Sequence, residues 1–181
     1  MGLYLLTPPT ADPVTVLEAK NFCKVTTDDE DALFQSLITA ATRHLERDLN
    51  VSLSEQQWKL SLNWFSDRIE LPRGPVIRID AIEYLNEEGL NQTADPALYR
   101  AVLESERQSL ERNFDITAPT AKVGSDVVSI TYTAGIGDIE TGQDIWLALL
   151  FLIQHFYTRG ISADGLPQIV TLLSQPYRRY T

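Results

Sequence analysis

Histidine, cysteine and serine are the side chains that most often carry catalysis or bind metals, so they are the first candidates for chemistry. The chain has 181 residues with two histidines, His44 and His155, and one cysteine, Cys23. Neither histidine belongs to an H-x-x-H or H-E-x-x-H motif, the spacing that places two ligands on one helical face. No catalytic motif surrounds Cys23, and no serine occupies a G-x-S-x-G turn. We therefore predict no catalytic residues, no metal ligands and no cofactor.

Two further segments resemble binding motifs. The acidic run at residues 28–31 could hold a metal, but it follows Thr27 in a T-x-x-E capping box and precedes an amphipathic stretch, so we interpret it as a helix start. Gly135-Ile136-Gly137 follows a predicted strand, as a dinucleotide-binding loop does. Glu140 stands where that motif has its third glycine, and a carboxylate there would repel a pyrophosphate. We interpret this segment as a turn between a strand and a helix.

Composition narrows the class of protein. The chain has 25 acidic and 15 basic residues, a net charge of −10, which disfavours specific DNA binding but suits a channel wall to which DNA must not adhere. A single cysteine excludes an intrachain disulfide and suits folding in a reducing cytoplasm. The N-terminus lacks the features of a signal peptide, and the longest apolar run, residues 145–153, is too short to span a membrane. We expect a protein without membrane contact.

Helical patterns occupy both ends of the chain. Residues 15–18 form a first capping box, and residues 28–49 carry an apolar stripe that Asn50 can end. Residues 143–159 are apolar on nearly every side, so this helix must be covered all round, either by its own chain or by a second subunit. The expected core or subunit-packing residues of that helix are Trp146, Leu150, Phe151, Phe156 and Tyr157.

The middle of the chain has the alternation of strands. Residues 58–64 and 128–134 alternate apolar and polar side chains, and the alternation within residues 76–85 slips near Ala81, which predicts a bulge. Further strands are expected at residues 68–71 and 99–103, a hairpin connection at 86–89, and a long loop at 104–124 with a short strand near Phe114.

This order of elements predicts an α+β fold, because the strands are grouped and do not alternate with helices. We expect one domain over residues 1–181. The N- and C-terminal helices, at about 15–50 and 143–174, form a helical bundle, and an antiparallel β-meander or sandwich at about 56–134 is inserted between them. A C-terminal tail follows at residues 175–181.

The tail contains the only adjacent basic pair in the chain, Arg178 and Arg179, between Tyr177 and Tyr180. Tyrosine and arginine together can stack on bases, and they are also enriched where proteins dock. A frayed terminus is the third interpretation. Because the rest of the chain is acidic, we favour docking on another protein.

Taken together, segments along nearly the whole chain resemble the head-to-tail connector, or adaptor, family of long-tailed phages, prophages and gene transfer agents. The matching stretches are residues 14–20, 28–31, 37–41, 45–46, 71–76, 82–85, 128–135, 155–157 with Arg159, and 176–180. The chain departs from the family where a Trp-Pro often precedes the last strand and a Val-Pro the long helix; the equivalent stretches here are Ala118-Pro119 and residues 139–142.

The resemblance implies a structural protein and no enzyme. Its subunits would form a ring, with twelve copies expected, at the neck of a virion or phage-like particle assembled in the host cytoplasm. The ring would join the portal protein to a stopper or tail-completion protein, and DNA would pass through it without specific binding. Residues 177–180 would dock on the portal. The alternatives are another non-catalytic interaction module of the virion or tail, and a hydrolase or nuclease with an unrecognised site.

Overall fold

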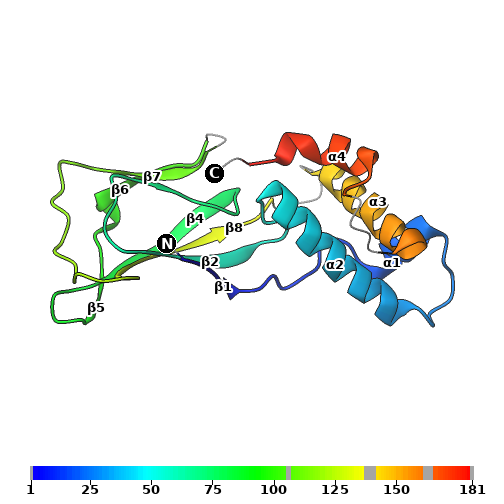
Figure 1. Ribbon diagram of the computed structural model, residues 1–181, viewed down its shortest axis with the longest axis horizontal. Helices are drawn as coiled ribbons and strands as arrows, with labels where there is room; N and C mark the ends of the chain where they lie inside the picture. Colours follow the sequence, from blue (N-terminus) through cyan, green and yellow to red (C-terminus); the bar gives the residue numbers. More distant parts are fainter. Residues whose placement is uncertain (1, 105–106, 137–141, 161–164, 180–181) are drawn as a thin grey trace. The chain divides into compact units, whose positions relative to one another are not determined.

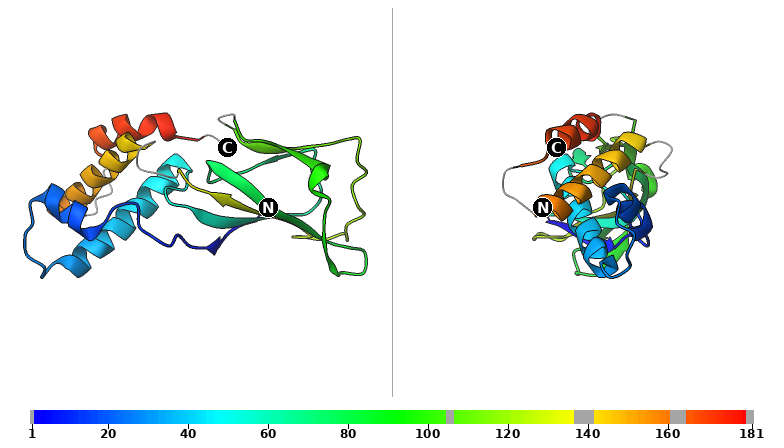
Figure 2. Two further views of the ribbon diagram at one scale, coloured as in Figure 1. Left: turned by 180° about the vertical axis from the view of Figure 1, so that it is seen from behind. Right: turned by 90° about the vertical axis from the view of Figure 1, so that its right-hand side faces the viewer.

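The computed structural model describes residues 2–104, 107–136, 142–160 and 165–179. The chain, expected as a single connector domain, divides into two compact units. The described residues within 11–54 and 136–179 form a helical unit, and those within 2–10 and 55–135 form a β unit. Figures 1 and 2 show the helices gathered in one unit and the strands in the other. The predicted α+β class is confirmed, with the terminal helices in one unit. Every strand is inserted between them except the first, at residues 2–7, which precedes the first helix.

The helical unit contains four α-helices and a terminal 3-10 turn among the described residues. They are α1 (Val16–Cys23), α2 (Asp31–Leu49), α3 (Gln143–Arg159), α4 (Gln168–Ser174) and η3 (Gln175–Tyr177). The capping box at the first helix is confirmed, because the Thr15 side chain accepts from the Glu18 backbone and the Glu18 carboxylate accepts from the Thr15 N–H at 2.7 Å.

The second predicted capping box is wrong. Helix α2 begins at Asp31, and its N-cap residue, Glu30, makes no side-chain capping bond. The acidic residues before it are used differently: the Lys20 ammonium donates to Asp28 at 2.7 Å and to Asp31 at 2.5 Å. The Lys20 side chain is 7% exposed whereas Asp28 is 90% exposed, so the cation is the buried partner. The Glu30 carboxylate, which the predicted capping box would use, instead accepts from the Tyr157 hydroxyl at 2.8 Å, so a tertiary contact has replaced the local one.

The apolar stripe of α2 packs against α3 to form the core of the helical unit. Phe34, Ile38 and Leu45 are fully buried, while Leu33, which the sequence placed in the stripe, is 47% exposed. Asn50 adopts the left-handed conformation that ends α2, as predicted. Helices α1, α2 and α4 all contact α3, so the helix that is apolar on most sides receives much of its cover from its own chain.

The β unit has two antiparallel sheets. The strands are β1 (Gly2–Thr7), β2 (Gln56–Leu62), β3 (Arg68–Glu70), β4 (Val76–Leu85), β5 (Asn91–Thr93), β6 (Tyr99–Val102), β7 (Ser109–Arg112) and β8 (Val128–Ala134), with the 3-10 turn η1 (Pro96–Leu98) before β6. One sheet has the order β1-β2-β8-β4-β5 and the other β3-β7-β6. The larger sheet is not a simple meander, because β8 pairs between β2 and β4.

The two sheets share one apolar core. Leu60, Ile130 and Tyr132 of the larger sheet and Leu110 of the smaller one are buried in it. The Tyr132 hydroxyl donates to the Pro72 carbonyl at 2.7 Å, and burial raises its pKa. The Tyr99 hydroxyl donates to the Ser66 carbonyl at 2.7 Å, and burial raises the pKa of Tyr99 to about 12. Both hydroxyls therefore stay protonated and act as fixed donors.

Several strand predictions are confirmed and others need correction. The bulge near Ala81 is present, together with a second register shift between Val76 and Arg78. The short strand expected near Phe114 lies earlier, in β7, and Phe114 is 72% exposed. Trp64 continues the alternation of β2 but lies beyond the end of the strand and is 66% exposed. Strands β1 and β5 were not predicted.

The burial asymmetry of the Lys20 pair predicts an unequal response to mutation. Asp28→Asn with Asp31→Asn would leave the buried ammonium uncompensated, so we expect the thermal unfolding midpoint to fall by about 5–10 °C. Lys20→Met would leave only carboxylates that water can solvate, and we expect a smaller loss. Thermal unfolding followed by circular dichroism measures both, with Asp29→Asn as the matched control. A larger loss from Lys20→Met than from the double variant would contradict this assignment.

Candidate functional site

His44, His155 and Cys23, for which we predicted no catalytic role, all lie beside apolar residues of the helical unit. The rings of His44 and His155 both lie beside Phe156, at centroid distances of 6.1 and 6.3 Å. Cys23 is partly buried against the helical core, and burial raises its thiol pKa, which disfavours the thiolate that nucleophilic chemistry needs. Among the described residues no three His, Cys, Asp or Glu side chains group as metal ligands. Residues 137–141, which include Glu140, lie outside the described part of the chain.

The predicted packing residues of α3 fall into two groups. Leu150 and Phe156 are buried in the helical core, while Trp146, Phe151 and Tyr157 are partly buried against it. Phe151 makes an edge contact with Phe22 at 5.1 Å. The Tyr157 hydroxyl donates to Glu30 at 2.8 Å, and this hydrogen bond raises the tyrosine pKa. The five residues thus pack within the helical unit, and whether any also contacts a second subunit stays a prediction.

The C-terminal tail lies against α2 of its own chain. The Arg178 guanidinium donates to the Asp48 carboxylate, and the Arg179 N–H donates to the Leu49 carbonyl at 2.9 Å. Tyr177 packs against the helical core, and burial raises its pKa. Tyr180 lies outside the described residues. The structure therefore places Arg178 and Arg179 at the C-terminal end of α2 and Tyr177 against the helical core, a placement that the sequence did not indicate.

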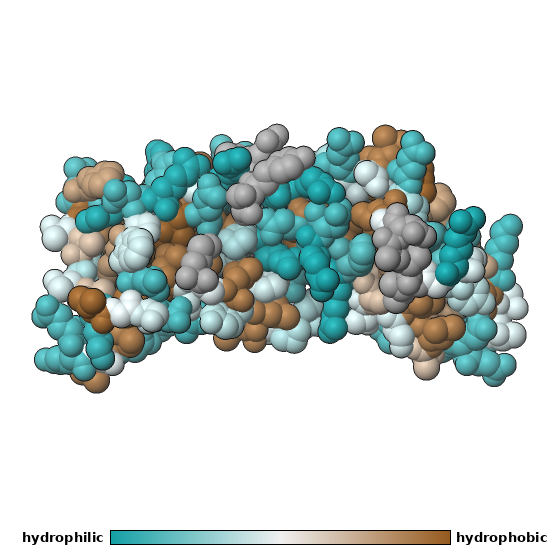
Figure 3. Space-filling model, viewed as in Figure 1, coloured by the Kyte–Doolittle hydropathy of each residue, from teal (hydrophilic) through white to brown (hydrophobic). Residues whose placement is uncertain are grey.

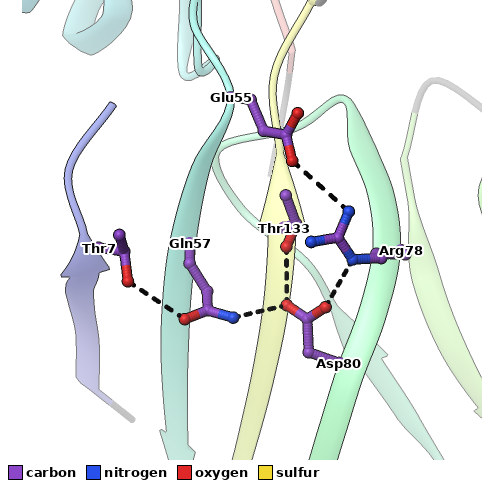
Figure 4. Close-up of polar contacts among 6 residues, drawn as sticks. All are labelled: Thr7, Glu55, Gln57, Arg78, Asp80 and Thr133. Carbon is purple, nitrogen blue, oxygen red and sulfur yellow. Dashed lines mark hydrogen bonds and ion pairs between the residues drawn. The ribbon is translucent and has the colours of Figure 1, made fainter. Parts of the chain in front are cut away.

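A polar network on the larger sheet was also not predicted (Figure 4). The Asp80 carboxylate accepts from the Thr133 hydroxyl at 2.7 Å, the Arg78 Nε at 2.8 Å and the Gln57 amide at 3.0 Å. The Asp80 side chain is 19% exposed. Its partial burial raises the pKa, but the three hydrogen bonds outweigh that effect and the pKa lies below its ordinary value. The carboxylate is therefore held ionised as an acceptor.

Asp80 occupies this position because of a bulge. Ile79 pairs with Tyr132 and Ala81 with Thr131, so Asp80 is the extra residue of the register shift. A slip in alternation is visible in the sequence and predicted the bulge. Two of its polar partners, Gln57 and Thr133, come from β2 and β8, far away in the chain, and a single sequence gives no signal for them.

Apolar surface interrupts the hydrophilic exterior on the face drawn in Figure 3. In β1, Tyr4, Leu5 and Leu6 are 46–55% exposed, and in α4 Leu172 is 66% exposed. No helix among the described residues is long and apolar enough to cross a membrane. Patches of this kind on a folded chain are typical of protein contacts.

Comparison with solved structures gives the same fold in three particle components. A chain in the neck of an empty gene transfer agent particle, computed with C6 symmetry, matches with a TM-score of 0.83 at 23% identity, over all of this chain and 97% of the other. Chains in the virion of a native gene transfer agent particle and in the neck of a native particle computed with C12 symmetry each match with a TM-score of 0.81 at 24% identity, over the same shares.

A search of curated proteins found no match. The profile of the head completion protein family, however, matches residues 14–165, a range that includes α1, α2, α3 and every strand after β1. This match agrees with the connector resemblance of the sequence. The chain belongs to the head completion protein family.

Proposed function

We propose that this chain is a structural subunit of the neck of a tailed phage or gene transfer agent particle. In this proposal it forms a ring beneath the portal, joins the head to the tail, and lets DNA pass. The observation that carries the proposal is the family match over residues 14–165, supported by the full-length likeness to chains of gene transfer agent necks and virions. The C6 and C12 symmetries with which those necks were computed favour a ring, with twelve copies expected.

Charge and chemistry are compatible with this role. The net charge of −10 disfavours adhesion of DNA to the ring, which must let the genome move through it. The mechanism is then geometric: subunits bind each other, the portal on one side and a stopper or tail-completion protein on the other. The particle would be assembled in the host cytoplasm.

The tail is the proposed portal-docking segment. Arg178 and Arg179 contact the C-terminal end of α2, Tyr177 packs against the helical core beside them in the chain, and Tyr180 follows outside the described residues. Arg178 and Asp48 are about one-third exposed, so the pair is accessible to a partner at the surface of the helical unit. A portal surface with carboxylates and apolar pockets could accept the tail. A portal carboxylate would then replace Asp48 as the partner of Arg178.

Deletion of residues 175–181 should weaken attachment to the portal by about tenfold or more, because Tyr and Arg anchors contribute most of the energy of such contacts. Binding of purified protein to the portal is the measurement, and thermal unfolding checks that the shortened chain stays folded. Removal of Thr181 alone is the matched control that keeps all four proposed docking residues. Undiminished portal binding by the 175–181 deletion would remove the tail from the docking contact.

Electron microscopy of particles that carry a tagged copy of the chain tests its position. We expect the tag at the neck, as a ring directly under the portal. A tag at the tail or baseplate would instead favour the alternative, a different non-catalytic virion module. Loss of the chain should leave heads that are filled but unjoined to tails, which negative-stain images distinguish.

A further inference from the structure

Strand β1 differs from the other sheet edges in having little protection against strand pairing. The two sheets end in β1, β5, β3 and β6. Strands β5 and β3 have three residues each, and β6 has four with Arg100 among them. Strand β1 has six residues and no charge. Soluble proteins usually shorten or charge an exposed edge to prevent pairing with another chain, so β1 is the edge most suited to a partner.

The side chains of β1 are only weakly engaged in their own unit. Leu3 packs against the β core, whereas Tyr4, Leu5 and Leu6 are 55%, 46% and 53% exposed. Strand β1 is therefore held mainly by its backbone pairing with β2, from Gly2 opposite Ser61 to Thr7 opposite Gln57. Detaching it removes little apolar burial, while three large apolar side chains remain to be covered.

The site that receives β1 is built without it. The Gln57 amide donates to Asp80 at 3.0 Å, which turns its carbonyl oxygen toward β1, where it accepts from the Thr7 hydroxyl at 3.3 Å (Figure 4). Asp80 is itself fixed by Thr133 and Arg78. Because these groups come from β2, β4 and β8, the acceptor stays in place whichever chain supplies the threonine.

The connection that follows β1 suits a strand that can leave its own unit. Residues 8–15 separate β1 from α1 and contain Pro8, Pro9 and Pro13. Proline-rich segments are stiff and extended, and they resist folding back on themselves. Such a segment can carry a strand to a neighbouring molecule, which is the usual basis of domain swapping.

We propose that in the assembled ring β1 pairs with β2 of a second copy, so that each copy gives one strand and receives one. The inference rests on the proposed ring. The occupant is a second copy because the β2 edge fits the side chains of β1 itself, with Leu3 opposite Leu60 and Thr7 opposite Gln57. The absence of charge on β1 also lets two chains of net charge −10 meet there without direct repulsion.

This exchange is compatible with cyclic symmetry. Donation in one direction joins unlike surfaces and can close into a ring, whereas reciprocal exchange would stop at a dimer. The strand contacts are the same before and after exchange, so the exchange itself is nearly neutral. The net gain comes from covering Tyr4, Leu5 and Leu6 between neighbouring copies.

A cysteine pair across the β1–β2 contact tests the proposal. Tyr4 and Lys59 are paired in register, so Tyr4→Cys with Lys59→Cys, in a Cys23→Ala background, should form a disulfide wherever β1 is seated. In rings assembled on the portal and then oxidised, we expect a non-reducing denaturing gel to show covalent oligomers of three or more chains. The unassembled protein should give the internal disulfide and run as a monomer.

Lys59→Cys with Thr131→Cys is the matched control, because these residues are paired in register between β2 and β8 and should stay linked within one chain in every state. Reduced variants must unfold at the wild-type temperature and form rings, and a second pair at Gly2 and Ser61, also opposite each other in register, replaces the first if they do not. Rings in which every disulfide is internal would overturn the exchange alone. A wild-type chain that forms no ring on the portal would overturn the proposed function and the exchange with it.

Discussion

The need to cover α3 organises the helical unit. An apolar helix of 17 residues in a chain of 181 has few elements available to bury it. Helices α1 and α2 come from the beginning of the chain and α4 from its end, and all three pack on α3. The two ends of the chain must therefore meet, and everything between residues 54 and 136 becomes an insertion that folds on its own core. The two-unit architecture follows from this requirement.

Much of this architecture was readable from local pattern. The regular spacing of apolar residues in α2, β2 and β8, and the long apolar run of α3, identified the main elements and the fold class. Local signals failed where a distant residue competed for the same group: the Tyr157 hydroxyl donates to Glu30, the carboxylate that the capping box expected at Thr27 would have used, and that box does not form. Strand β5 has three polar residues and no period at all, and β1 has an apolar run without alternation.

The C-terminal tail and the Asp80 network were predictable only in part, because both depend on contacts between residues that are far apart in the chain. Composition singled out the Tyr177–Arg178–Arg179 segment, but its position on Asp48 and Leu49 depends on a contact across more than a hundred residues. The Asp80 network joins four strands, and its geometry exists only after β8 has entered between β2 and β4. Family membership, in contrast, is encoded in the order of many weak matches along the chain, so the amino-acid sequence alone was enough to indicate it.

The contact of Arg178 with Asp48 has a consequence for the strength of any complex that uses the tail. A free tail would contribute its whole interaction energy to a partner, but this tail already has a partner within its chain. Binding a partner through the tail first costs the contact with Asp48, so only the difference in free energy between the two contacts contributes to binding. One subunit therefore binds the partner more weakly than the tail–partner contacts alone would indicate. A multivalent array recovers that loss, because many small differences add when the copies bind together. Tail capture of this kind would discriminate between a complete array and an isolated molecule through avidity, with no change in fold.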